Sequence, residues 1–301
     1  MTKPEIPQNP HACSFTELAE SVGHINTFWK ARWNLQCPGF CFRGADNAAY
    51  DLNPNLLRRP YPDNAEELAR LENSLWVEFR LRSKPLVGHL VESSWEALLT
   101  MQQYGFPTRL LDWSTSLAVA AYFAVRDIDS ENDGAVWMMA SRRLMELRGF
   151  PGAWRTVVGD PALQSLGIRD NPDELVAFNA QVPAPLAPDH FSPRMITQQG
   201  IYTLHTFERN ALEKLAVSDG DDFGGSGFLH KIIIPACAKE ALRSELTLLA
   251  GVSEHVLFPD LDGLARSIVA EHKRIRARKD GCEEPGLVAS ILSAMTGNKM
   301  T

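Results

Sequence analysis

The chain has 301 residues, 45% of them hydrophobic, which is enough to build the core of one large domain or two small ones. Its formal net charge of −7 argues against a generally basic, nucleic-acid-binding surface, although a local basic patch stays open. No segment approaches the roughly 20 apolar residues that span a bilayer, so we expect a cytoplasmic protein without membrane association. The scattered cysteines form no CxxC pair and indicate neither a disulfide framework nor a zinc site.

The first third of the chain contains three predicted helices and one predicted strand; the third helix is opened by a capping box of Ser93 and Glu96 and runs through Met101. Ser14 and Glu17 form a capping box that opens an N-terminal helix. Residues 38–43 have the apolar character of a short buried strand, and residues 64–82 have a helical composition. The Asn-Pro pair at 53–54 predicts an ordered loop between them.

Residues 101–116, MQQYGFPTRLLDWSTS, are the most informative segment because polar groups interrupt an apolar strand there. Gly105 and Pro107 predict a turn, and residues 108–113 a short strand. The hydroxyl residues that follow can cap an apolar helix over 117–125. A hydroxyl-rich turn between a strand and a helix often presents N–H groups to an anionic ligand.

The rest of the chain continues the mixture of strands and helices. The predicted elements are a strand at 134–139, a helix at 142–147, an irregular insert at about 150–193 with a short helix near 172–178, a strand-like segment at 195–206, a strand at 231–235, and helices at 239–249 and 260–278. Without regular alternation, this order favours an α+β fold with a single mixed or antiparallel sheet flanked by helices. We expect an N-terminal helical segment at 1–35, a main domain at 36–278 and a C-terminal tail at 279–301.

Five sequence blocks follow one another along this domain. They are FRG at 42–44 with LNPNLLR at 52–58, QQYGFPTRLLDW at 102–113, AAYFA at 120–124, PRMITQQGIYT at 193–203, and LFPDLDGL at 257–264. Together these blocks resemble the bacterial FRG domain family. That family is defined by its motifs, so the resemblance implies membership without implying a particular reaction.

The order of these motifs is also similar to that of the ADP-ribosyltransferase superfamily, which implies an ADP-ribosyltransferase-like fold and NAD as substrate. By this similarity, Arg43 binds an NAD phosphate and the turn at 114–116 braces the nicotinamide ribose. Gln198 and Gly200 then fall near the catalytic Gln/Glu-x-Glu positions. Gly200 stands where the superfamily has a glutamate, so a catalytic carboxylate would come from elsewhere, such as Asp112 or Glu208, or catalysis would proceed without one.

Several of these residues have a structural interpretation beside the functional one. The guanidinium fork of Arg43 suits a phosphate, and Gly44 lets a ligand or a backbone approach, but Arg43 can equally pair with Asp112. Asp112 can cap the next helix, orient Arg43 or act as a general base. Arg109, three residues before Asp112, is expected on the opposite face of the strand.

The predicted catalytic residues are Asp112 and Gln199, and the predicted nucleotide-binding residues are Arg43, Gly44, Arg109, Ser114, Thr115 and Ser116. Gln198 and Gln199 are expected to alternate across a strand. Asp260 and Asp262 fit a helix N-terminus, so we predict no metal site.

Three hypotheses about function remain. The first is an NAD-dependent transferase or NAD-cleaving enzyme that acts on an unknown macromolecular acceptor. The second is a non-catalytic module that senses a nucleotide or nucleic acid, in a stress or phage-defence setting, by analogy alone. The third is a metal-dependent nuclease or hydrolase, which requires the chain's carboxylates to converge: Asp46, Asp51, Asp112, Asp260 and Asp262.

Overall fold

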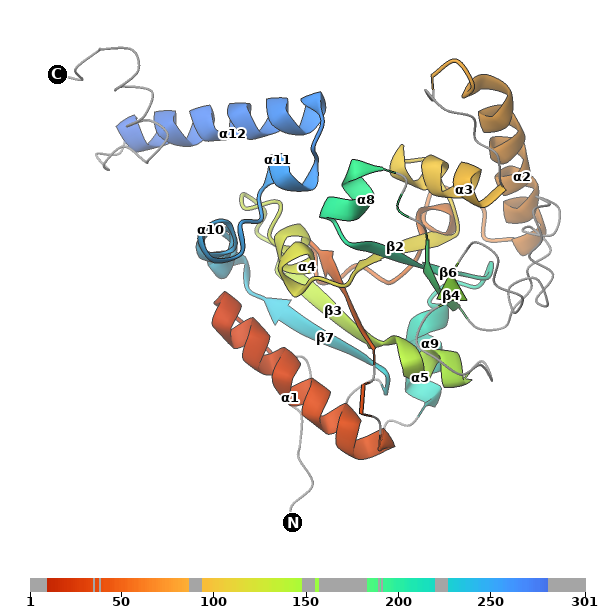
Figure 1. Cartoon of the computed structure of the whole chain (residues 1–301), viewed down its shortest axis with the longest axis horizontal. Helices are drawn as coiled ribbons and strands as arrows, with labels where there is room; N and C mark the ends of the chain where they lie inside the picture. The colour runs from red at the N-terminus through yellow and green to blue at the C-terminus, as the bar shows by residue number, and fades with distance from the viewer. Residues whose placement is uncertain are drawn as a thin grey trace.

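A single twisted sheet forms the centre of the protein (Figure 1). The computed structural model describes residues 10–34, 36–37, 39–86, 94–147, 155–156, 183–188, 190, 192–219 and 227–280. The strands are β1 Phe40–Ala45, β2 Leu110–Ser114, β3 Gly134–Ala140, β4 Arg155–Thr156, β5 Ala184–Ala187, β6 Gly200–Leu204 and β7 Leu229–Ile234. Their order is β4-β5-β6-β2-β1-β3-β7. All neighbours are antiparallel except β4, which runs parallel to β5, so the predicted α+β fold with one mixed sheet is confirmed.

The helices surround this sheet. They are α1 Phe15–Trp33, α2 Ala65–Arg82, α3 Ser94–Gln103, α4 Leu117–Ala124, α5 Ser141–Leu147, α8 Pro193–Thr197, α9 Ala211–Ser218, α10 Lys239–Ala250, α11 Glu254–Leu257 and α12 Leu261–Asp280, with short 3-10 turns at Asn55–Leu57 and Ala236–Ala238. Ser14, Asn64 and Ser116 are the N-caps of α1, α2 and α4. Their side chains accept hydrogen bonds from main-chain N–H groups in the first turn of each helix, which fixes where the helix begins.

Helix α4 packs so closely on β1 that the strand needs a glycine there. A Cβ at Gly44 would overlap the carbonyl oxygen of Ala120 and lie 2.6 Å from the backbone nitrogen of Ala124. Ala120 and Ala124 of α4 face this contact, and both are buried. The close approach predicted for Gly44 is therefore that of a helix backbone.

The pairing of the central strands is uneven. β1 pairs with β3 over six residue pairs and β2 with β6 over five, whereas β1 and β2 share only the pair Phe42 and Ser114. The two central strands therefore diverge beyond Phe42. The space between β1 and β2 therefore lies beside the FRG motif and the end of the QQYGFPTRLLDW motif.

The structure differs from the predicted elements between residues 150 and 206. Residues 195–197 belong to helix α8, and the strand begins only at Gly200. Ser192 caps α8 and Pro193 occupies its first turn, which is a helix start signal that the strand prediction overlooked. The predicted irregular insert contributes β4 and β5 to the sheet edge, while its predicted helix near 172–178 lies outside the described residues.

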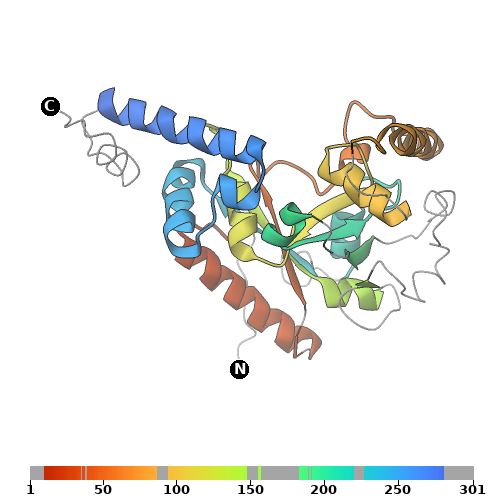
Figure 2. The ribbon, with the colours of Figure 1, turned by 45° about the horizontal axis from the view of Figure 1, so that its top comes forward.

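The last helix extends away from the rest of the protein in both views (Figures 1 and 2). Its start is fixed because Asp260 accepts a hydrogen bond from the Gly263 N–H at 2.8 Å, which confirms the predicted cap. The tail beyond Asp280 lies outside the described residues. Within the described ranges, no helix is both long enough and apolar enough to cross a bilayer.

Candidate functional site

A cavity of about 300 Å³ lies where the diverging strands meet the helices on one side of the sheet. That volume is at the lower end of the range for ligand pockets. We call it the Arg43 pocket. Its polar lining comes from β1, α3, β2, the end of α4, α8 and β6, and comprises Arg43, Gln102, Gln103, Asp112, Ser114, Arg126, Arg194, Gln198 and Tyr202. Aromatic walls are supplied by Phe42, Trp113, Phe123 and Phe258.

Arg43 bridges the gap between β1 and β2. Its Nη1 donates a hydrogen bond of 2.7 Å to the main-chain oxygen of Asp112 and lies 3.8 Å from the carboxylate of the same residue. The side chain is 19% exposed. Burial lowers the pKa of Arg43 to about 10, an effect that Asp112 opposes and Arg58 reinforces. The guanidinium therefore stays positively charged at neutral pH, in a partly desolvated position.

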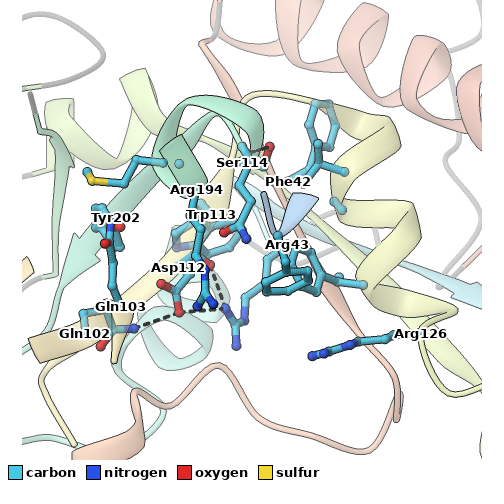
Figure 3. Close-up of a pocket in the computed structure, with 18 residues that line it drawn as sticks. Phe42, Arg43, Gln102, Gln103, Asp112, Trp113, Ser114, Arg126, Arg194 and Tyr202 are labelled. Carbon is cyan, nitrogen blue, oxygen red and sulfur yellow. Dashed lines mark hydrogen bonds and ion pairs between the residues drawn. The ribbon is translucent and has the colours of Figure 1, made fainter. Parts of the chain in front are cut away.

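Asp112 lies at the mouth of the same pocket, with 56% of its side chain exposed. The Gln102 amide donates to its Oδ2 at 2.8 Å, and the Thr108 hydroxyl donates to the Gln102 carbonyl. Figure 3 shows Gln102, Asp112 and Arg43 as a connected row along the pocket. Of the three roles predicted for Asp112, its contacts fit the orientation of Arg43, while Ser116 caps the following helix.

Two further arginines line the pocket, each held by a carboxylate. Arg126 lies 3.3 Å from Glu254, and Arg194 pairs with Asp260 at 2.5 Å. Both guanidinium groups lie over the ring of Phe258, at 5.1 and 5.4 Å from its centre. The pocket is therefore lined by three guanidinium groups, and among the described lining residues Asp112 is the single acid.

The hydroxyl-rich turn is mainly a structural device. Ser114 donates to the main-chain oxygen of Gln198 at 2.7 Å and accepts from the Ser116 N–H at 3.0 Å, so it ties β2 to the end of α8. Thr115 donates to the Gln199 side chain at 3.0 Å and is exposed. Only Ser114 of these three hydroxyl residues lines the pocket.

Gln199 lies outside the pocket lining, although it was predicted to be catalytic. It follows α8 in the left-handed region, with a φ of 46°, and its side chain is directed to Thr115. Gln198 does line the pocket, and its amide donates to the Leu257 main-chain oxygen at 3.0 Å. The expected alternation of the two glutamines across a strand is wrong because both precede β6.

Arg109 also lies away from the pocket, and we withdraw it from the nucleotide-binding set. Its guanidinium is fully buried and pairs with Glu72 of α2, with Nε at 3.0 and 2.8 Å from the two carboxylate oxygens. It also stacks over Phe207 at 4.4 Å and donates to the main-chain oxygen of His205. The predicted separation of Arg109 from Asp112 agrees with this arrangement, and it leaves Arg109 a structural role.

Sequence reasoning missed the residues that complete the pocket from distant segments. Arg194 and Phe258 belong to two of the five sequence blocks, but nothing local indicates that these blocks meet. Arg126 comes just after Val125, the C-cap of the apolar helix α4, where a basic residue also suits the helix dipole. For Arg194 and Phe258, the one available signal was that their two sequence blocks occur in the same chain as the FRG and QQYGFPTRLLDW motifs.

The carboxylates of the metal-dependent hypothesis have other partners in several cases. Asp260 accepts from the Gly263 N–H and pairs with Arg194, and these contacts lower its pKa. Asp112 contacts Gln102 and Arg43. Over the part of the chain that the structure describes, no three His, Cys, Asp or Glu residues form a group that could hold a metal ion.

Comparison with known proteins adds one finding. Residues 38–133 match the family model described as the FRG domain, which includes β1, the central motif and α4. Neither the curated proteins nor the solved structures contain a match to the chain. The further similarity to ADP-ribosyltransferases therefore gains no support from these comparisons. Residues of the FRG motif and of the QQYGFPTRLLDW motif both line the Arg43 pocket, and both motifs lie in the segment, residues 38–133, that is an FRG domain.

Proposed function

We propose that the Arg43 pocket binds a phosphate-bearing nucleotide, with NAD as the first ligand to test, and that the protein does so in the cytoplasm, where NAD is available. The observation that carries the proposal is the convergence of Arg43, Arg126 and Arg194 on one cavity, where Asp112 is the one acid among the described lining residues. A guanidinium fork binds phosphate oxygens through two parallel hydrogen bonds. Aromatic side chains beside these arginines offer apolar surfaces to a base or a nicotinamide ring.

The three arginines are prepared for this role in different ways. Arg126 and Arg194 are oriented by Glu254 and Asp260 outside the pocket, so their positions are fixed before a ligand arrives. Arg43 donates to a main-chain carbonyl and keeps its carboxylate contact at 3.8 Å. A phosphate can therefore occupy the free donors of Arg43 without breaking a short ion pair.

Asp112 is the residue on which turnover would depend. When the bond between the ribose and nicotinamide breaks, its electron pair leaves with nicotinamide and positive charge develops on the ribose. A carboxylate at the pocket mouth stabilises that charge and accepts a proton from the attacking water, which yields ADP-ribose, nicotinamide and a proton. An acceptor hydroxyl in place of water would give ADP-ribosylation.

Calorimetric titration with NAD and ADP-ribose tests the binding step. Arg43→Ala should weaken affinity by about 10-fold or more, because a hydrogen bond to a charged group contributes about 1.5–3 kcal/mol. Arg70→Ala is the matched control, since Arg70 is 70% exposed and its ion-pair partner within the described part of the chain is Glu66, on the surface of α2. No saturable binding by the unmodified protein, or equal affinity in the Arg43→Ala variant, would refute the proposal.

Mass spectrometry of released nicotinamide tests the catalytic step separately. Asp112→Asn should preserve binding and lower turnover by about 100-fold, whereas the exposed loop variant Asp129→Asn should leave both unchanged. Saturable binding without nicotinamide release would assign the pocket to a non-catalytic nucleotide sensor. Turnover that survives Asp112→Asn would remove Asp112 from the mechanism.

A further inference from the structure

A second and larger cavity lies on the other side of Arg126. Its volume is about 730 Å³, and its walls come from α4, α10, α11 and α12. Of the residues that the structure describes, Arg126 is the one that lines both this second cavity and the Arg43 pocket. The nucleotide proposed for the Arg43 pocket does not occupy this second cavity. The second cavity has polar lining side chains of its own.

The carboxylate of Glu254, which lines the second cavity, interacts with three neighbouring side chains. Glu254, which is buried, accepts a 2.5 Å hydrogen bond from the Tyr122 hydroxyl. The same side chain lies 2.7 Å from Arg266 and 3.3 Å from Arg126. These interactions lower the pKa of Glu254 despite its burial, so the group is a stable anion.

Arg243 of α10 is the cation in this cavity that Glu254 does not reach directly. It donates to the main-chain oxygen of Arg126 at 2.7 Å and to the Tyr122 hydroxyl at 3.4 Å. Within the described residues, its contacts are these two oxygens and the Tyr122 ring. A guanidinium whose acceptors are a neutral carbonyl and a phenol keeps donors for an anion.

The balance of charge in the cavity is positive. Among the described residues, three arginines line it, and its two acids are Glu254 and Glu271. The phenol of Tyr122 and the imidazoles of His255 and His272 also line it. Apolar side chains such as Ile268 also line the cavity. A guanidinium that is not neutralised by a carboxylate attracts an anion more strongly beside such side chains than it would in open solvent.

We propose that the second cavity is an anion-binding site for a phosphate- or carboxylate-bearing small molecule, with Arg243 and Arg126 as its principal donors. The bound anion would neutralise the positive charge that Glu254 and Glu271 leave on the three arginines. Because Arg126 also lines the Arg43 pocket, the anion would lie next to the ligand of that pocket. The proposal is independent of which ligand the Arg43 pocket takes.

Calorimetry on an Arg43→Ala background isolates this site from the Arg43 pocket. Inorganic pyrophosphate and citrate serve as separate probes, which distinguishes phosphate from carboxylate chemistry. We expect the Arg43→Ala protein to bind at least one probe at a single site. Adding Arg243→Ala should weaken that binding at least about tenfold, whereas adding the surface variant Arg70→Ala should leave it unchanged.

Ile268→Trp provides a second test that keeps the charges intact. Ile268 is 49% exposed, so the substitution fits the fold and places an indole in the cavity, where it should exclude the probe. If Arg243→Ala loses its circular dichroism spectrum, Ile268→Trp becomes the deciding variant. Absence of probe binding by the Arg43→Ala protein, or unchanged affinity in the deciding variant, would overturn the proposal whatever NAD does.

Discussion

Gly44 shows how one residue of the FRG motif supports the site without binding a ligand. Because its missing side chain is what admits the backbone of α4, Gly44→Ala should push that helix off β1. We expect a loss of about 3 kcal/mol in the free energy of unfolding, at the upper end of overpacking effects. Urea denaturation measures this, and NAD titration should show weakened binding because Val119 and Ala120 of α4 line the pocket.

Gly23→Ala is the matched control for that substitution. Gly23 lies within α1 and an added Cβ would meet no atom within 4 Å. Alanine is favoured over glycine inside a helix, so this variant should gain up to about 1 kcal/mol in the free energy of unfolding. Similar stabilities for the two variants would contradict the steric role of Gly44.

His205 makes the stability of the protein sensitive to acid. Burial, reinforced by the positive charges of Arg43 and Arg109, lowers its pKa to about 3. A histidine in the unfolded chain has a pKa of about 6.5. As the pH falls below that value, His205 is protonated in the unfolded chain but stays neutral in the folded chain. The free energy of unfolding should therefore decrease on acidification, by up to about 1.4 kcal/mol per pH unit from this group.

Replacing the imidazole isolates this contribution. His205 shares a 2.9 Å hydrogen bond between its Nε2 and the Thr203 hydroxyl, which a glutamine amide can reproduce. Urea unfolding of the unmodified protein and of His205→Gln at about pH 7 and about pH 5 gives the comparison, and the variant should lose less stability between them. Parallel losses would show that other groups carry the acid sensitivity.

At the scale of elements, one buried ion pair fastens α2 to the sheet. Arg109 and Glu72 are 0% and 4% exposed. Glu72→Ala leaves the guanidinium buried without its carboxylate, so we expect a loss of about 3–5 kcal/mol in the free energy of unfolding. Glu78→Ala on the same helix breaks an exposed pair with Arg82 and should cost less than about 1 kcal/mol. Equal losses in thermal or urea denaturation would contradict this role.

The elements that could be predicted from the sequence are those with strong local signals. The caps at Ser14, Ser116 and Asp260 and the apolar runs of β3 and β7 led to the correct elements. Helix α8 was mistaken for a strand because its five residues are too few to show helical periodicity.

The site was predictable in part, for a similar reason. Arg43 and Asp112 could be named because their motifs are local, and both line the pocket. The position of Arg109 depended on Glu72, which comes from a helix 37 residues earlier. Arg126, Arg194 and Phe258 join the pocket only through the fold, and no local pattern reports such convergence.

At the scale of the whole molecule, the family match covers less than the folding unit. Residues 38–133 include β1 and β2, yet the strands that pair with them most extensively, β3 and β6, lie outside the match. Within the match, the two strands share one registered pair. The pocket likewise takes Arg194 and Phe258 from later in the chain.

An isolated fragment of residues 38–133 should therefore fail to fold. Its two strands would expose unpaired edges, and α4 would lose part of the surface on which it packs. A fragment of residues 10–280 retains the described sheet and should unfold in one cooperative transition. Circular dichroism melts of the two fragments, together with the dispersion of amide signals in NMR spectra, provide the measurement. A cooperative melt of the shorter fragment would mean that the FRG domain is a unit independent of β3 and β6, and that Arg194 and Phe258 are additions to a site that is already formed.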